Sequence, residues 1–137
     1  MRIAPLAAAC VVACALAERA APQSLPRSYA ELAERAAVAK RVLRLRARRD
    51  AFADRYAAVL DGGGGSVRTD DAREAKREID AALWLVSQDL TWNPGSTIAL
   101  DRAEANLRRA ECVFADRLLP LLAKGRADEA RRAAAPR

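Results

Sequence analysis

Cationic side chains are the most concentrated chemical groups in this chain. Residues 40–49 contain six of them. Placed on a helix, four of the six share one side and form what we call the basic ridge, which consists of Lys40, Arg41, Arg44 and Arg48. Such a ridge is typical of a solvated helix face, and it also suits docking on an acidic protein surface or on anionic lipid head groups. We therefore take the basic ridge as a candidate partner-binding surface.

Two further arginines of this segment suggest a different chemistry. Arg46 and Arg49 lie on or near the apolar stripe that contains Val42 and Leu60. An arginine buried on such a stripe needs an anionic partner, because an unpaired buried charge is costly. Arg46 and Arg49 are therefore candidates for holding an anionic ligand between helices.

The two tryptophans are candidate contacts for a partner protein. Trp84 lies off the apolar stripe of its predicted helix, and Trp92 lies in the turn that follows. Exposed Trp side chains are frequent anchors of protein interfaces. The alternative is that they pack in the core or cover one end of the fold.

Residue types that usually carry catalysis are scarce. The chain has no histidine, and its acidic residues mostly stand at helical pairing distances from arginine, which is typical of helix support. Asp70, Asp71 and Glu74 suit a helix N-terminus better than a metal, since they lack the spacing of a calcium loop. We expect no catalytic residue, no metal and no cofactor. The cations have no aromatic residues beside them, which disfavours nucleic acid as a partner.

The glycine run Asp61 to Ser66, DGGGGS, is the remaining feature that resembles a ligand site. A phosphate-binding loop needs a strand before its glycines and, in the Walker form, a Lys and a hydroxyl directly after them. Here a predicted helix precedes the run, and the residues that follow the glycines, SVRTDD, contain no Lys. We interpret the run as a flexible connection between two antiparallel helices.

The N-terminal residues 1–17, MRIAPLAAACVVACALA, have the basic start, short apolar run and small residues of a secretory signal. Three alternatives stay open: cleavage near Ala17, acylation of Cys14 in a lipobox-like VVAC, and retention as an anchor. Each predicts an exported protein. Residues 18–27 then form a linker, and Cys112 is the single cysteine beyond the signal, predicted to be a buried small apolar residue.

Apolar spacing predicts three long helices, near 29–61, 70–91 and 97–124. Ser28, Thr69 or Asp70, and Ser96 or Thr97 are the predicted starts, and Pro120 should bend or end the third helix before a stop at Gly125. The first helix carries two apolar stripes on different sides, so it either kinks, divides or touches different neighbours.

The predicted fold is therefore all-α. We expect an antiparallel up-down bundle of three long helices, or four if the first divides, over residues 28–125. Residues 126–137 should form a short helix or a disordered tail.

Three segments give the chain a family likeness. VLRLRARRDAFADRYAAVL, DDAREAKREID and the closing LLPLLAKG follow one another in the same order as in PsbQ-type extrinsic proteins of photosystem II, which the chain resembles over residues 28–125. The resemblance implies a four-helix up-down bundle in the thylakoid lumen, or on a lipid anchor there, that stabilises the oxygen-evolving core without catalysis. No individual binding residue is carried over, because three long helices are evident here unless the first one divides.

Two classes of function follow. The first is a non-catalytic exported bundle that docks on a larger complex through the basic ridge and a Trp. The second is a small helical sensor or anionic-ligand-binding domain, or an exported helical enzyme of the chorismate-mutase type. Arg46 and Arg49 separate the two, since only the second class needs them buried around an anion.

Overall fold

The computed structural model describes residues 28–62, 67 and 69–135. Every secondary-structure element in this part of the chain is a helix, as the sequence predicted. The signal residues 1–17 with Cys14, the linker and most of the glycine run lie outside the described residues. The chain up to Ala33 is a separate unit, so contacts between helices are described for residues from Glu34 onward.

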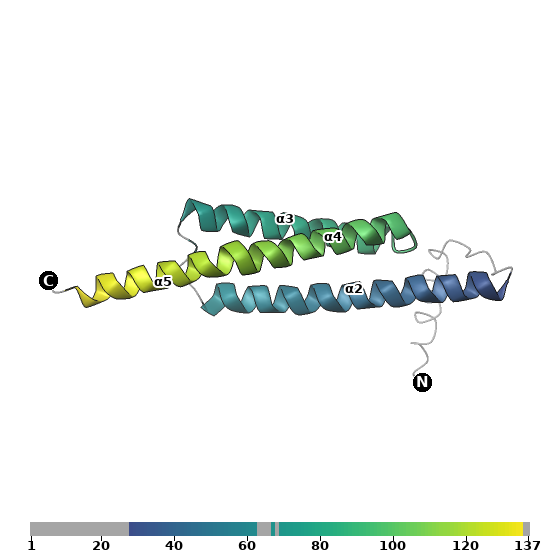
Figure 1. The fold of residues 1–137 in the computed structure, drawn as a ribbon, viewed down its shortest axis with the longest axis horizontal. Coiled ribbons are helices and arrows are strands. Elements are labelled where there is room, and N and C mark those ends of the chain that lie inside the picture. The colour runs from purple at the N-terminus through teal and green to yellow at the C-terminus, as the bar shows by residue number, and fades with distance from the viewer. Residues whose placement is uncertain (1–27, 63–66, 68, 136–137) are drawn as a thin grey trace, which may run out of the picture. The chain divides into compact units, whose positions relative to one another are not determined.

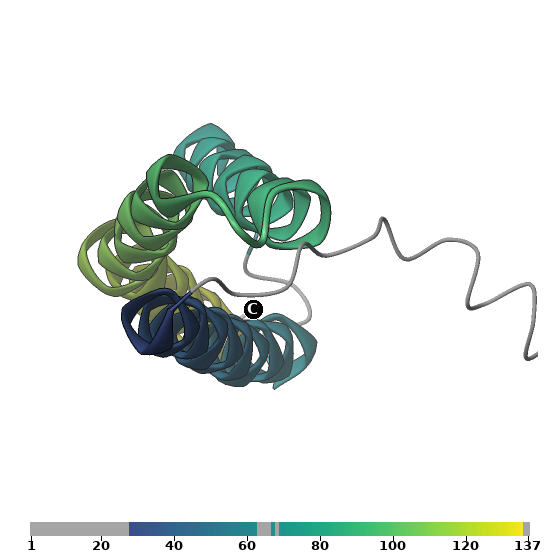
Figure 2. The same cartoon turned by 90° about the vertical axis from the view of Figure 1, so that its right-hand side faces the viewer.

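Three helical rods make up the described chain. The first is α2 (Tyr29–Gly62), and the second is α3 (Asp70–Trp92). The third is continuous and consists of α4 (Thr97–Val113), the π-helical turn η1 (Phe114–Leu118) and α5 (Leu119–Ala134). Figure 1 shows α3 beside α4, and Figure 2 shows the same pair nearly end-on.

The predicted helix starts are confirmed by their caps. The side chain of Ser28 accepts a hydrogen bond from the backbone N–H of Glu31 at 3.2 Å. Thr69 and Ser96 do the same at the starts of α3 and α4. These side chains satisfy N–H groups that have no partner inside the helix, which is why each helix begins at that residue.

The first helix neither kinks nor divides. α2 is a single helix whose buried stripe is Val42, Leu45, Phe52 and Tyr56. The other apolar stripe predicted from the sequence, which includes Ala36, Ala39 and Leu43, faces away from this core. Leu43 on that stripe is 65% exposed. One stripe of α2 therefore packs in the core, and the other lies on the side of the helix that faces away from the core.

The expected end of the third helix near residue 124 is wrong, because the helix continues to Ala134. Pro120 has no N–H to donate to the carbonyl of Asp116, which would normally bend or end an α-helix. The preceding turn is instead π-helical, with the N–H of Leu119 bonded to the carbonyl of Phe114. We attribute the continuity to this wider turn, which accommodates the missing bond. Gly125 does not act as a stop, since no described glycine has a positive φ.

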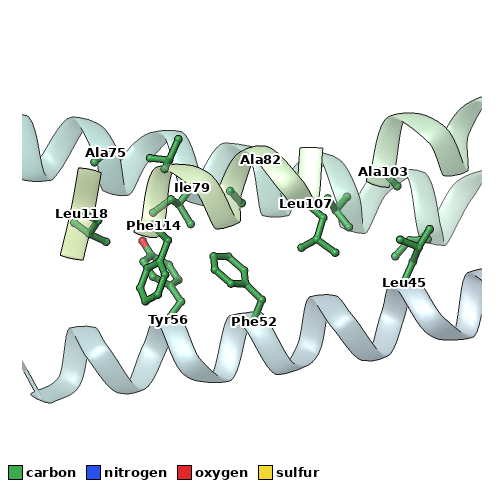
Figure 3. Packing of buried hydrophobic residues seen from close by; sticks show 14 of the residues in the cluster. Leu45, Phe52, Tyr56, Ala75, Ile79, Ala82, Ala103, Leu107, Phe114 and Leu118 are labelled. Carbon is green, nitrogen blue, oxygen red and sulfur yellow. The ribbon is translucent and has the colours of Figure 1, made fainter. Parts of the chain in front are cut away.

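The core has two kinds of interface. α3 and α4 meet through fully or nearly fully buried alanines, which let the two backbones approach closely: Ala75, Ala82, Ala103 and Ala110. α2 reaches them through larger side chains. Figure 3 shows Phe52 and Tyr56 extending from α2 toward Phe114, and the Phe52 and Phe114 ring centroids are 5.5 Å apart, edge to face.

Ion pairs between helices fix their relative directions. Asp89 pairs with Arg102 and Glu78 pairs with Arg109, so α3 and α4 run in opposite directions. Arg41 pairs with Glu104 and Arg48 with Glu111, so α2 and α4 run in the same direction.

Candidate docking surfaces

Half of the predicted basic ridge is used inside the chain. The guanidinium of Arg41 bonds Asp101 at 2.7 Å and Glu104 at 2.8 Å, both on α4. Arg48 forms a two-bond pair with Glu111, also on α4. Hydrogen bonds from Arg41 and Arg108 lower the pKa of Glu104, because they stabilise its charged form. Arg41 and Arg48 therefore hold α2 against α4.

The other half of the ridge faces solvent. Lys40 and Arg44 are exposed, and neither makes an ion pair with another described residue. Of the four cations of the basic ridge, only Lys40 and Arg44 are therefore available to a partner without loss of an ion pair within the described part of the chain. A docking role for Lys40 and Arg44 stays a prediction.

Arg46 and Arg49 have protein partners, and neither is fully buried. Arg46 donates to the backbone carbonyl of Leu90 at 3.0 Å, one of the last carbonyls of α3, which lack partners inside the helix. Arg49 donates to Asp50 at 2.6 Å and to the hydroxyl of Ser87 at 3.5 Å. The bonds to Leu90 and Ser87 join α2 to the C-terminal part of α3. Arg46 is exposed and Arg49 is half-buried, so neither is a buried arginine that would need an anionic ligand.

Both tryptophans are exposed. Trp84 is 61% exposed and Trp92 is 72% exposed, so the interpretation that they pack in the core is wrong. The core positions of α3 are filled by smaller residues such as Ala82 and Val86, which leaves Trp84 on the outward side. Leu85 and Ile98 are exposed as well.

Trp84 lies on a face of α3 that also carries arginine. Arg77 precedes it by seven residues, which places the two on the same side about 10 Å apart along the helix. Arg73 and Arg77 line an open hollow of about 440 Å³ at the start of α3, together with Asp70 and Lys76. We call Arg73, Arg77 and Trp84 the Trp84 face.

The charges of the Trp84 face are only partly neutralised. Arg73 pairs with Asp70 at 3.0 Å, whereas Arg77 makes no ion pair with a described residue. Arg49 reaches Ser87, one turn beyond Trp84, from the neighbouring helix. The exposed indole therefore has Arg77 on its own helix face, and the approach of Arg49 to the following turn depends on how α2 meets α3, which sequence spacing does not show.

Cys112 is exposed, so its expected burial is wrong. The core stripe of α4 runs through Ala103, Leu107 and Ala110. Cys112 lies on the opposite side of the helix from this stripe, since two residues correspond to a rotation of about 200°.

Several interhelical contacts were missed at the level of sequence. Asp89, which is only 4% exposed, accepts two hydrogen bonds from Arg102 across the α3–α4 turn, and these lower the pKa of its carboxyl group. The hydroxyl of Tyr56 donates to Asp80 at 2.9 Å, and burial raises the pKa of this tyrosine. The opposite charges of Asp89 and Arg102 stand on either side of a predicted tight turn, and this pattern could have indicated their contact. No sequence pattern indicates the contact between Tyr56 and Asp80.

Two properties of the described residues bear on the other candidate sites. No group of three or more His, Cys, Asp or Glu side chains among them is arranged to hold a metal ion. None of the helices in this part of the chain combines the length and the apolar character needed to cross a membrane.

Comparison with known proteins returned no match: no family model, no curated protein and no solved structure is similar to this chain.

Proposed function

We propose that this chain is a non-catalytic, exported helical-bundle protein that docks on an acidic surface of a larger complex. Its helices form a three-helix up-down bundle, in which α2 and α4 run one way and α3 runs the other. The directions of the interhelical ion pairs support this arrangement. The bundle is the scaffold, and the function lies on its surface.

The exposure of Trp84 beside arginine is the observation that carries the docking proposal. A large indole group left 61% exposed gains free energy when a partner covers it. Trp and Arg are the residue types most enriched among interface residues that contribute strongly to binding. Arg77 supplies an exposed positive charge on the same face of α3, which favours a carboxylate-rich partner.

We therefore place the proposed docking site on α3, whereas the sequence predicted the basic ridge on α2. Arg41 and Arg48 already bind carboxylates of α4, so engaging them with a partner would cost those internal pairs. The Trp84 face requires no such exchange at Arg77. The anionic-ligand alternative is not favoured, because Arg46 and Arg49 are engaged by Leu90, Asp50 and Ser87.

The exported compartment follows from the signal-like residues 1–17, and the PsbQ-type role is the specific form that we propose for the docking. In that form the partner is a lumenal surface of photosystem II. In the general form it is any acidic protein of the exported compartment, with an anionic membrane surface as the competing candidate.

The test compares capture of partners from the native exported fraction at low salt by the wild-type chain and by three variants. Trp84→Ala should lower the affinity for the partner by about 2 kcal/mol, or roughly thirtyfold. Arg77→Glu should also weaken capture, and the wild-type interaction should weaken as salt rises.

Arg126→Glu is the matched control, because Arg126 is exposed on α5, away from the Trp84 face, and makes no ion pair with a described residue. It reverses the same charge and should leave capture unchanged. Equal loss from Arg77→Glu and Arg126→Glu would show that net charge alone drives binding. Unchanged capture by Trp84→Ala would refute the proposal.

A further inference from the structure

The outer face of α2 is the side of the helix opposite the core. Every residue on it from Ala36 to Asp61 is exposed. At 3.6 residues per turn, this face comprises one set of positions about 180° from Val42, Leu45, Phe52 and Tyr56. Those positions are Ala36, Lys40, Leu43, Ala47, Asp50, Ala51, Asp54, Ala58 and Asp61, with Ala39, Arg44 and Ala57 at the edges.

Charge is distributed unevenly along this face. Lys40 and Arg44 lie in its first half, whereas Asp54 and Asp61 lie in its second half. None of the four makes an ion pair with another described residue. Asp50 also belongs to the second half, but its charge is offset by Arg49, which bonds it at 2.6 Å.

A helix face that is positive at one end and negative at the other is complementary to itself when a second copy runs antiparallel. We propose that this chain forms a two-fold symmetric dimer in which the outer faces of two α2 helices pack against each other. In such an interface every contact occurs twice, so residue i meets j and j meets i. The proposal is independent of the Trp84 face, which lies on α3.

One register satisfies both the charged and the apolar residues. If Arg44 lies opposite Asp54 of the second copy, then Lys40 lies within one helical turn of Asp61 of that copy. In the same register Leu43, which is 65% exposed in the single chain, lies within about 3 Å along the axis of Ala57 of the second copy. The small side chains around it allow the two helices to approach closely.

The parallel alternative is disfavoured by the same charges. In a parallel pair in register, Lys40 would face Lys40 of the second copy and Asp54 would face Asp54. Like charges opposite each other destabilise an association, and burial of Leu43 alone is too small a gain to offset them. The charge pattern therefore selects the antiparallel two-fold.

The experiment is sedimentation equilibrium of the chain at low ionic strength, with circular dichroism to establish that each variant is folded. Wild type should be in monomer–dimer equilibrium. Arg44→Glu and Asp54→Arg should each weaken dimerisation about tenfold, since each disrupts two symmetry-related pairs of opposite charge. Combining the two substitutions should restore the wild-type affinity, because the pairs reform with reversed polarity.

Arg77→Glu on α3 is the control, and it should leave dimerisation unchanged while it weakens partner capture. Arg44→Glu should weaken dimerisation and leave partner capture unchanged. Failure of this inference is therefore distinguishable from failure of the proposed function. A monomer at all concentrations would overturn the inference. A dimer that the double reversal fails to restore would place the interface on another face and would also overturn the inference.

Discussion

Removing the ring of Phe52 should weaken the packing of α2 against the other two helices. The Phe52 side chain is 2% exposed, and it stacks with Tyr56 and meets Phe114 edge to face. The guanidinium of Arg55 lies 5.6 Å from the centres of both the Phe52 and Phe114 rings. These contacts are the centre of the interface that α2 makes through long side chains.

The expected magnitude follows from the volume lost. Phe→Ala in a core typically costs about 3–5 kcal/mol of unfolding free energy, which includes the lost edge-to-face contact. Domains of this size are usually stable by about 5–15 kcal/mol. Phe52→Ala should therefore lower the free energy of unfolding by about 3 kcal/mol or more, as measured by urea denaturation followed by circular dichroism.

Trp84→Ala is the matched aromatic control for this measurement. Its side chain is exposed, so its removal should change the free energy of unfolding by less than about 0.5 kcal/mol. If Phe52→Ala cost less than about 1 kcal/mol, the aromatic cluster would not hold α2, and the core described above would be wrong.

Three further outcomes are expected. Hydrogen bonds from Arg102 lower the pKa of Asp89 in the folded state, so the Asp89 carboxylate binds a proton more tightly in the unfolded chain. The stability that the charged carboxylate contributes is therefore lost as the pH falls. The thermal midpoint of wild type should drop more between about pH 5 and pH 2 than the thermal midpoint of Asp89→Asn. Gly125→Ala should raise the free energy of unfolding by about 0.5–1 kcal/mol in urea denaturation, because the helix passes through residue 125, whereas a helix stop there would give a loss. Ser96→Ala should lower the free energy of unfolding by about 1 kcal/mol in the same assay, because it removes the cap of α4, and Ser96→Asp should retain most of it.

The helix starts were predictable because they depend on local chemistry. A short polar side chain such as Thr69 or Ser96 bonds an N–H three residues ahead, so sequence spacing alone is sufficient. The continuation through Pro120 was not predictable in this way. A proline predicts a bend or an end, and whether the turn before it widens depends on the packing of Phe114 and Leu118 in the core.

The candidate site was predicted less well because it depends on tertiary contacts. Sequence spacing correctly put four cations on one helix, yet it did not reveal that Arg41 and Arg48 face carboxylates about sixty residues away. It identified Trp84 as lying off the core stripe, but exposure is decided by which side of α3 meets α2 and α4. A charged or indole side chain is available to a partner only if contacts within the fold do not already engage it.

The most direct test of docking through the Trp84 face is site-specific photo-crosslinking in the chain's native compartment. A photoreactive amino acid replaces Ala81, which is exposed one helical turn before Trp84, in one version of the chain and Arg126, exposed on α5, in another, so that the indole of Trp84 is kept in both. One dominant crosslinked partner is expected from position 81, lost at high salt, when Arg77→Glu is added and when Trp84→Ala is added, with background labelling from position 126. Equal labelling from the two positions would contradict docking through the Trp84 face.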